Sequence, residues 1–111
     1  MAGSSQVGIE VDFAALPVLP EAMDFIKQGV VPGGTKKNHK FYAPRVEYAA
    51  SLSEAEQLLC CDAQTSGGMV ISTPANKADA MVGALKKHGA LSHAIIGKVV
   101  ADHPGKLTVK N

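Results

Sequence analysis

The sequence has few of the residues that build disulfide scaffolds or metal sites. Its 111 residues contain no tryptophan and only two cysteines, the neighbours Cys60 and Cys61. Adjacent cysteines cannot form an ordinary disulfide with each other without strain, and a zinc site needs further ligands that are missing. None of the four histidines has a second histidine at the i,i+4 spacing. We therefore expect two buried thiols rather than a redox pair, and no metal site.

Strong charge and long apolar runs are also missing. The formal net charge is +1, and no apolar run approaches the roughly 20 residues that span a bilayer. Without a basic stripe or a polybasic arm, we expect neither a nucleic-acid nor a membrane partner. The N-terminus has no secretion signal, so we expect a cytoplasmic protein. The length and the 46% apolar content suit a single soluble domain over residues 1–111.

The first two elements follow from periodicity and from helix signals. Residues Val7 to Phe13 alternate apolar and polar, which predicts a half-buried strand. A helix is expected from about Pro20 to Gln28, with proline in its first turn and Gly29 after its end. The stretch that follows, residues 30–45, is rich in glycine, proline and charge, and we expect a long surface loop there.

Further elements are predicted in the second half of the chain. Ser53 and Glu56 form a capping-box pattern that begins a short helix, and apolar spacing predicts a longer helix over about residues 76–88. The apolar run Met69–Thr73 has the composition of a buried strand. Residues 94–100 and 106–110 are expected to pair as an antiparallel hairpin about the turn at 102–105. The predicted fold is α/β of the α+β type, a mixed sheet with helices mainly on one face.

Two glycine-bearing segments are candidates for ligand contact. They read GVVPGGTKKN, residues 29–38, and DAQTSGG, residues 62–68. Adjacent glycines let backbone N–H groups approach an oxyanion, and the polar side chains can add donors. The same residues are ordinary in turns, and in isolation the pattern favours turns. The candidate residues are Gly33, Gly34, Thr35, Asn38, Asp62, Gln64, Thr65, Ser66, Gly67 and Gly68.

Neither segment has the spacing of an established nucleotide loop or of a nucleophile. GxxxxGK[ST] and GxGxxG are both absent, which excludes a P-loop and a dinucleotide-binding fingerprint. Ser66 lies in no GxSxG elbow and has no identified base, so we assign no catalytic residue.

Taken together, these segments resemble a known family. ALPVLPEAMDFIKQGVVPGGTKKN, then LLCCDAQTSGGMVIST and later AIIGKVV, are similar in order and approximate spacing to the C-terminal domain of selenophosphate synthetase, also called selenide, water dikinase. The similarity runs from about residue 7 to residue 109. Position 63 is alanine where the family usually has proline, which gives the unfolded chain more freedom there.

The resemblance implies a fold and a parent reaction. The fold is that of the aminoimidazole ribonucleotide synthetase superfamily, in which an N-terminal domain binds ATP and an α/β C-terminal domain packs beside it. The parent reaction converts selenide, ATP and water to selenophosphate, AMP and phosphate, with magnesium. The implied partner is therefore the nucleotide-binding domain, in the same polypeptide or as a split chain.

The residues that carry the family's chemistry have no match in this sequence. The reactive cysteine or selenocysteine, its nearby lysine and the magnesium-binding aspartates belong to segments that are absent here, and Cys60 and Cys61 do not correspond to the reactive cysteine. We therefore expect a C-terminal domain fragment that is inactive alone and holds no cofactor itself. The alternative is a free-standing, non-catalytic module that binds a partner protein or a phosphate-bearing ligand. Either version is expected to leave apolar surface uncovered and to self-associate.

Overall fold

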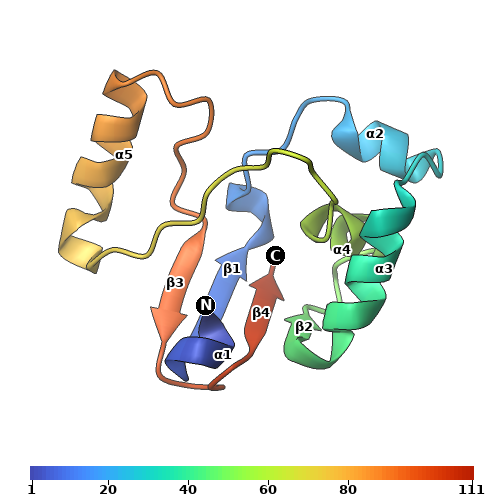
Figure 1. Ribbon diagram of the computed structural model, residues 1–111, viewed down its shortest axis with the longest axis horizontal. Helices are drawn as coiled ribbons and strands as arrows, with labels where there is room; N and C mark the ends of the chain where they lie inside the picture. The colour runs from blue at the N-terminus through green and yellow to red at the C-terminus, as the bar shows by residue number, and fades with distance from the viewer.

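The computed structural model describes residues 1–111, which form a four-stranded mixed sheet with five α-helices (Figure 1). The strands lie in the order β2-β4-β1-β3, with β1 parallel to β4, β4 parallel to β2, and β1 antiparallel to β3. The strands are β1 (Gly8–Asp12), β2 (Val46–Tyr48), β3 (Gly97–Val100) and β4 (Leu107–Lys110). The helices are α1 (Ala2–Ser5), α2 (Ala22–Lys27), α3 (Gly33–Tyr42), α4 (Glu54–Cys60) and α5 (Ala78–Lys87).

The two faces of the sheet differ in chemistry because side chains alternate along each strand. On one face, Glu10 of β1 forms ion pairs with Lys98 of β3 at 3.2 Å and with Lys110 of β4 at 2.7 Å. The opposite face is apolar, and its centre is Val109 of β4, which is 1% exposed and lies beside Val11 in the register. The apolar face is the one that requires cover from helices.

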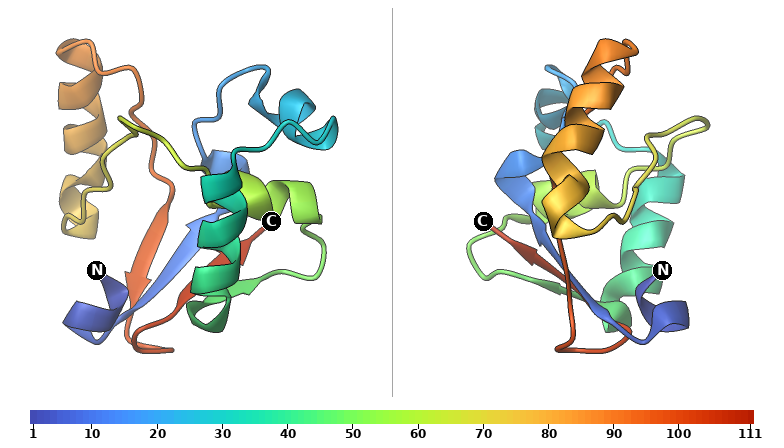
Figure 2. Two further views of the ribbon diagram at one scale, coloured as in Figure 1. Left: turned by 45° about the vertical axis from the view of Figure 1, so that its right-hand side comes forward. Right: turned by 90° about the vertical axis from the view of Figure 1, so that its left-hand side faces the viewer.

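Helices cover the apolar face only in part. In Figure 2, α1, α3 and α4 gather over one side of the strands, whereas α5 stands apart beyond β3. Helix α2 packs against α4, and α3 also contacts α4. No residue of α5 is buried. None of the helices has the length and apolar content needed to cross a bilayer.

Four of the predicted elements are confirmed. The alternating run Val7–Phe13 forms β1, and the helix expected from about residue 20 forms α2. The capping box is present at α4: Ser53 Oγ accepts from the Glu56 N–H, and the Glu56 carboxylate accepts from the Ser53 N–H at 2.7 Å. Helix α5 ends before Gly89, whose φ of 73° is the left-handed conformation expected there.

The predicted hairpin is wrong in its pairing. Both strands exist, but β1 lies between β3 and β4, so the two are not neighbours. The connection between them crosses the start of β1, where the Gly105 N–H donates to the Val7 carbonyl at 3.0 Å. A Cβ on Gly8 would lie 2.0 Å from the Asp102 carbonyl oxygen. Glycine at position 8 thus leaves room for the segment that joins β3 to β4. This segment passes over the start of β1 instead of forming a tight hairpin turn.

The predicted surface loop over residues 30–45 is also wrong, because most of it is helix α3. The residues that α3 turns inward are polar: Thr35 is buried, and Asn38 and His39 are half-buried. Their spacing is i, i+3, i+4, the period of one helix face. The inward face therefore follows helical periodicity without the apolar residues by which such periodicity is usually recognised.

The predicted strand Met69–Thr73 does not form. Residues 64–73 lie in no strand, and no backbone–backbone hydrogen bond joins them to the rest of the chain. β propensity describes how well a residue fits a paired, half-buried surface, and this segment has no neighbouring strand. The composition was that of a strand, but the pairing partner is absent.

The chain exposes more surface than a compact protein of its mass. Its solvent-accessible area is 7889 Å², and only 4 of its 111 residues are buried. A compact monomer of this mass is expected to expose about 5,800 Å². The radius of gyration is 14.5 Å, whereas a compact domain of this length has about 13 Å. The chain is therefore less compact than a domain of its length usually is.

A Gly8→Ala substitution should destabilise the fold, because the new methyl group would overlap the Asp102 carbonyl oxygen. Overpacking of this kind costs about 1–3 kcal/mol in the free energy of unfolding. Gly83, in the middle of α5, has open space where a Cβ would lie, so Gly83→Ala should stabilise the helix by up to about 1 kcal/mol. Urea unfolding of both variants measures the contrast. Equal effects of the two substitutions would contradict the proposed crossing at Gly8.

The Glu10 ion pairs predict a pH dependence. Hydrogen bonds from Lys110 and then from Lys98 hold the pKa of Glu10 below its ordinary value of 4.5. A carboxylate with a lowered folded-state pKa stabilises the fold above its unfolded pKa, and the contribution is lost as the pH falls through the folded value. The free energy of unfolding should thus fall less on acidification below pH 4.5 in Glu10→Gln than in the wild type. Glu21→Gln, at a carboxylate with no ion pair, should follow the wild type.

Candidate functional site

The two glycine-bearing segments predicted from the sequence meet in the structure. Thr35, in the first turn of α3, has a fully buried side chain. Its hydroxyl donates to Asp62 Oδ1 at 3.1 Å and accepts from the Ala63 N–H at 3.1 Å. One hydroxyl therefore serves as donor and acceptor between a helix and the loop 27 or 28 residues further along the chain.

Two more of the predicted residues complete this contact. Asn38, one turn after Thr35, donates from Nδ2 to the Cys61 carbonyl oxygen at 3.2 Å, which satisfies an acceptor just after the end of α4. Gln64 donates from Nε2 to Asp62 Oδ2 at 3.1 Å. We name these four side chains, Thr35, Asn38, Asp62 and Gln64, the α3–α4 clasp.

Two of the predicted glycines lie tightly against the clasp. A Cβ on Gly34 would be 3.0 Å from the Cβ of Ala63, so the missing side chain lets α3 and the loop approach. A Cβ on Gly67 would be 2.8 Å from Gln64 Oε1. Open space surrounds Gly33 and Gly68. At positions 34 and 67, glycine is therefore explained by the close approach of neighbouring atoms, without a ligand.

The remaining predicted residues face outward. Thr65 and Ser66 are exposed, and neither hydroxyl takes part in a hydrogen bond within the chain. They form, with Gly67 and Gly68, a surface loop that begins where the clasp ends. The structure therefore places four of the ten candidates in the clasp and four in an exposed loop, Thr65–Gly68, whereas Gly33 and Gly34 begin helix α3.

The clasp carboxylate does not fit a magnesium ion by itself. Magnesium prefers an octahedral set of oxygen ligands, usually with one or two carboxylates. Both oxygens of Asp62 already accept side-chain hydrogen bonds, from Thr35 and from Gln64. No group of three His, Cys, Asp or Glu side chains gathers here or elsewhere in the chain. We therefore derive no step through a metal ion at this site.

A second set of polar contacts joins the same part of the molecule, and the sequence analysis did not predict it. The Tyr48 hydroxyl lies 3.4 Å from Cys61 Sγ, and His39 Nε2 lies 3.2 Å from Gln57 Oε1. The rings of His39 and Tyr48 are 5.9 Å apart. These contacts join β2, α3 and α4. The i,i+4 spacing of Thr35 and His39 could have indicated one helix face. It was not recognised because the residues on that face are polar.

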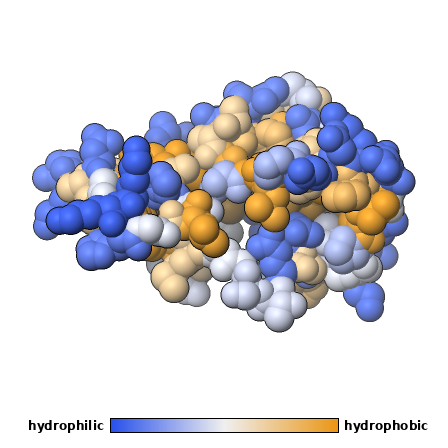
Figure 3. Space-filling model, turned by 90° about the horizontal axis from the view of Figure 1, so that it is seen from above, coloured by the Kyte–Doolittle hydropathy of each residue, from blue (hydrophilic) through white to orange (hydrophobic).

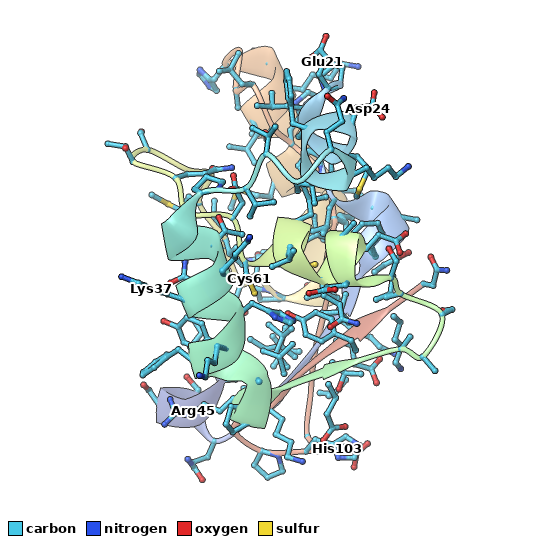
Figure 4. All side chains as sticks on the ribbon, turned by 90° about the vertical axis from the view of Figure 1, so that its right-hand side faces the viewer. Glu21, Asp24, Lys37, Arg45, Cys61 and His103 are labelled. Carbon is cyan, nitrogen blue, oxygen red and sulfur yellow. The ribbon has the colours of Figure 1, made fainter.

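Both cysteines are free and half-buried beside these contacts, and Figure 4 shows Cys61 between α3 and α4, whereas Lys37 points away from the interface. Burial, and then the neighbouring Cys61, raises the pKa of Cys60 to about 11. Burial and the hydrogen bond to Cys61 raise the pKa of Tyr48. A thiol with so high a pKa stays protonated at neutral pH, which makes it a poor nucleophile.

A cavity of about 400 Å³ opens where the clasp meets the sheet. Its floor is apolar, with Val46, Leu107 and Val109, and Asn38 and Asp62 lie at its wall. The short helix α1 borders it at the N-terminal end of the chain. The cavity therefore lies between the sheet, the clasp and α1, over a part of the apolar face that is itself buried at Val109.

Comparison with known proteins gives one family and a consistent set of relatives. The family described as AIR synthase related protein, C-terminal domain, matches residues 1–110. Proteins named selenide, water dikinase are 34% identical in Pelobacter propionicus over 99% of this chain, and 34% identical in Clostridioides difficile over 98%. The one from Pseudomonas aeruginosa is 39% identical over 90%. The chain spans only 32%, 31% and 28% of these relatives, respectively.

Removal of the Thr35 hydroxyl should weaken the clasp. Thr35→Ala leaves the Ala63 N–H and one oxygen of Asp62 without their partner. Because Asp62 and Ala63 are exposed and water can replace the hydroxyl in part, each lost hydrogen bond should cost about 0.5–1.5 kcal/mol. Thr35→Ser keeps the hydroxyl and should retain most of the stability. Chemical unfolding of the two variants separates loss of the hydrogen bonds from loss of the methyl group. Equal destabilisation by alanine and serine would contradict the role of the hydroxyl.

Proposed function

Because the chain belongs to the family of the AIR synthase related protein C-terminal domain, we propose that it supplies the C-terminal domain of a selenophosphate synthetase. In the proposed enzyme, ATP, selenide and water give selenophosphate, AMP and phosphate. One observation carries the proposal: relatives named selenide, water dikinase match almost the whole chain, although it spans less than a third of their length in each case quoted. As part of an ATP-dependent enzyme it would act in the cytoplasm.

The chain's own residues hold a loop in place in this proposal. The clasp fixes the end of α4 against α3, and it thereby fixes where the chain enters the loop Thr65–Gly68. The free hydroxyls of Thr65 and Ser66 can then donate to a surface brought against them. We assign that surface to the nucleotide-binding domain, with the loop at the cleft or at the interface between the two domains.

The proposal includes that the chain is catalytically silent alone. Phosphoryl transfer needs groups that neutralise phosphate charge and position the nucleophile. Asp62 is engaged in the clasp, and the Cys60 thiol has a raised pKa. Nucleotide, magnesium and selenide would therefore be bound by the remainder of the enzyme. The alternative, a free-standing binding module, requires instead that the chain bind a phosphate-bearing ligand or a protein without that remainder.

Complementation tests the proposal. The experiment mixes this chain with the part of the Pelobacter propionicus relative that lies outside the match, and it measures AMP release from ATP with and without selenide. The chain alone should release no AMP, and the mixture should release AMP only with selenide. A Thr65→Ala, Ser66→Ala variant should lower that activity at least tenfold, because it removes both free hydroxyls.

Ser92→Ala is the matched control, since Ser92 is an exposed hydroxyl far from the clasp in sequence. It should leave the activity of the mixture unchanged. AMP release by this chain alone would contradict its proposed silence. Stable binding to the remainder without any gain in activity would contradict its assignment as the missing domain.

A further inference from the structure

The side of α3 that faces away from α4 carries several positive charges and no negative one. Thr35 and Asn38 face the end of α4 and the loop after it through the clasp. Because an α-helix has 3.6 residues per turn, Lys36, Lys37 and Lys40 then lie on the opposite side. All three lysines are exposed, and none of them forms an ion pair. The clasp therefore fixes which side of α3 meets solvent, and that side is basic.

The charge of this region differs from that of the whole chain. No aspartate or glutamate occurs between Asp24 and Glu47, whereas Lys27, the three lysines of α3 and Arg45 make up five of the chain's 11 lysine and arginine residues. Arg45 is exposed just after α3, and Figure 4 places it near the end of that helix. Asp62, the carboxylate that α3 contacts, lies on the inward side. The net charge of +1, on which the expectation of no nucleic-acid partner depended, conceals this concentration because the acidic residues lie elsewhere.

An exposed aromatic side chain lies among these cations. Phe41, one turn after Lys37, is 72% exposed, although phenylalanine is usually buried. Its ring meets the ring of Tyr42 at an interplanar angle of 87°, with 5.0 Å between the ring centroids. Seen from above, the end of the molecule formed by α2 and α3 shows apolar groups among hydrophilic ones (Figure 3). We name Lys36, Lys37, Lys40 and Phe41 the α3 outer face.

Cations around a free aromatic ring match the chemistry of a single-stranded nucleic acid. Lysines neutralise phosphates, and an aromatic ring stacks on an unpaired base. A protein partner fits less well, because lysine is depleted at protein–protein interfaces. A membrane fits less well too, because an interfacial helix inserts a broad apolar face, whereas Phe41 is the only large apolar residue on this side of α3.

We propose that the α3 outer face binds single-stranded RNA. Its three lysines, together with Arg45, contact phosphates, and Phe41 stacks on an unpaired base. Unpaired bases are typical of RNA, whose loops and ends are the usual targets of single-strand recognition. The binding leaves the clasp intact, and it does not depend on the proposed enzymatic function.

Fluorescence anisotropy of a labelled single-stranded RNA of about 12 nucleotides, titrated with the full chain, measures this binding. We expect saturable binding at low salt that weakens as the salt concentration rises. Each neutralised phosphate of a single strand contributes about −0.7 to the slope of log K against log salt concentration, so four cations predict a slope of about −2.8.

A pair of lysine substitutions tests the phosphate contacts against a matched control. Lys37→Gln, Lys40→Gln and Lys86→Gln, Lys87→Gln each remove two exposed lysines from a helix and change the net charge equally, but only the first pair belongs to the α3 outer face. The first pair should weaken RNA binding at least tenfold at low salt and reduce the size of the slope by about 1.4. The second pair should leave both within about twofold of the wild type. Circular dichroism checks that both variants keep the fold.

Substitutions of Phe41 test the stacking. Phe41→Ala and Phe41→Leu should each weaken binding of the single strand about tenfold, whereas Phe41→Tyr should retain it, because only tyrosine keeps an aromatic face. Neither loss should extend to an RNA duplex of the same length, whose bases offer no free face. Phe25→Ala, at a phenylalanine of α2 that is 52% exposed, should bind the single strand as the wild type does.

Four outcomes overturn the proposal. The first is no saturable binding of the single strand at low salt. The second is an equal loss in the two lysine pairs, because binding would then follow net charge alone. The third is full binding by Phe41→Leu, because the ring would then not stack on a base. The fourth is tighter binding to phosphatidylserine vesicles or to polyglutamate than to the single strand, which would assign the α3 outer face to a membrane or to an acidic protein.

Discussion

The hydrogen bonds of the Thr35 side chain connect parts of the molecule that would otherwise have little to hold them together. Its hydroxyl bonds Asp62 and the Ala63 N–H from the first turn of α3, and it is fully buried there. Buried polar groups specify geometry more sharply than apolar contacts do, because a partly satisfied network is costly. With the contact of Asn38 to the Cys61 carbonyl, this fixes how α3 and α4 sit over the apolar face.

The rest of the chain shows what happens where no such contact exists. The apolar face is well covered at Val109 and Leu52, which are 1% and 4% exposed. Beyond β3, the segment 64–73 and α5 have neither a buried residue nor a ladder. A small core supplies little stability to elements it does not touch. The clasp side is therefore held together by buried contacts, whereas the side beyond β3 keeps its apolar side chains exposed.

The sequence predicted the elements whose formation depends on local signals. The capping box began α4 at the expected residue, alternation indicated β1, and α5 ended at its glycine. Prediction failed where the outcome depends on distant contacts. Helix α3 was missed because its inward residues, Thr35, Asn38 and His39, are polar and bury themselves by hydrogen bonds to another helix or to the loop after it.

The pairing of the strands was the second feature that the sequence did not predict correctly. Two strands joined by a turn were expected to be neighbours, but β1 lies between them and Gly8 lets the connection pass. Strand propensity at Met69–Thr73 could not reveal that the segment has no neighbour. At the site, two motifs supplied all ten candidates, but nothing in them separated the four side chains of the clasp from the exposed hydroxyls of Thr65 and Ser66.

In the proposed enzyme, the two motifs are joined to each other to position a loop, and nucleotide binding belongs to the remainder of the enzyme. Calorimetric titration of this chain with ATP, ADP, AMP and phosphate, with and without magnesium, tests it most directly. This chain alone should give no saturable heat with any of these ligands. Saturable heat that disappears in a Thr35→Ala, Ser66→Ala variant would contradict it, because the two segments would then form a phosphate site unaided.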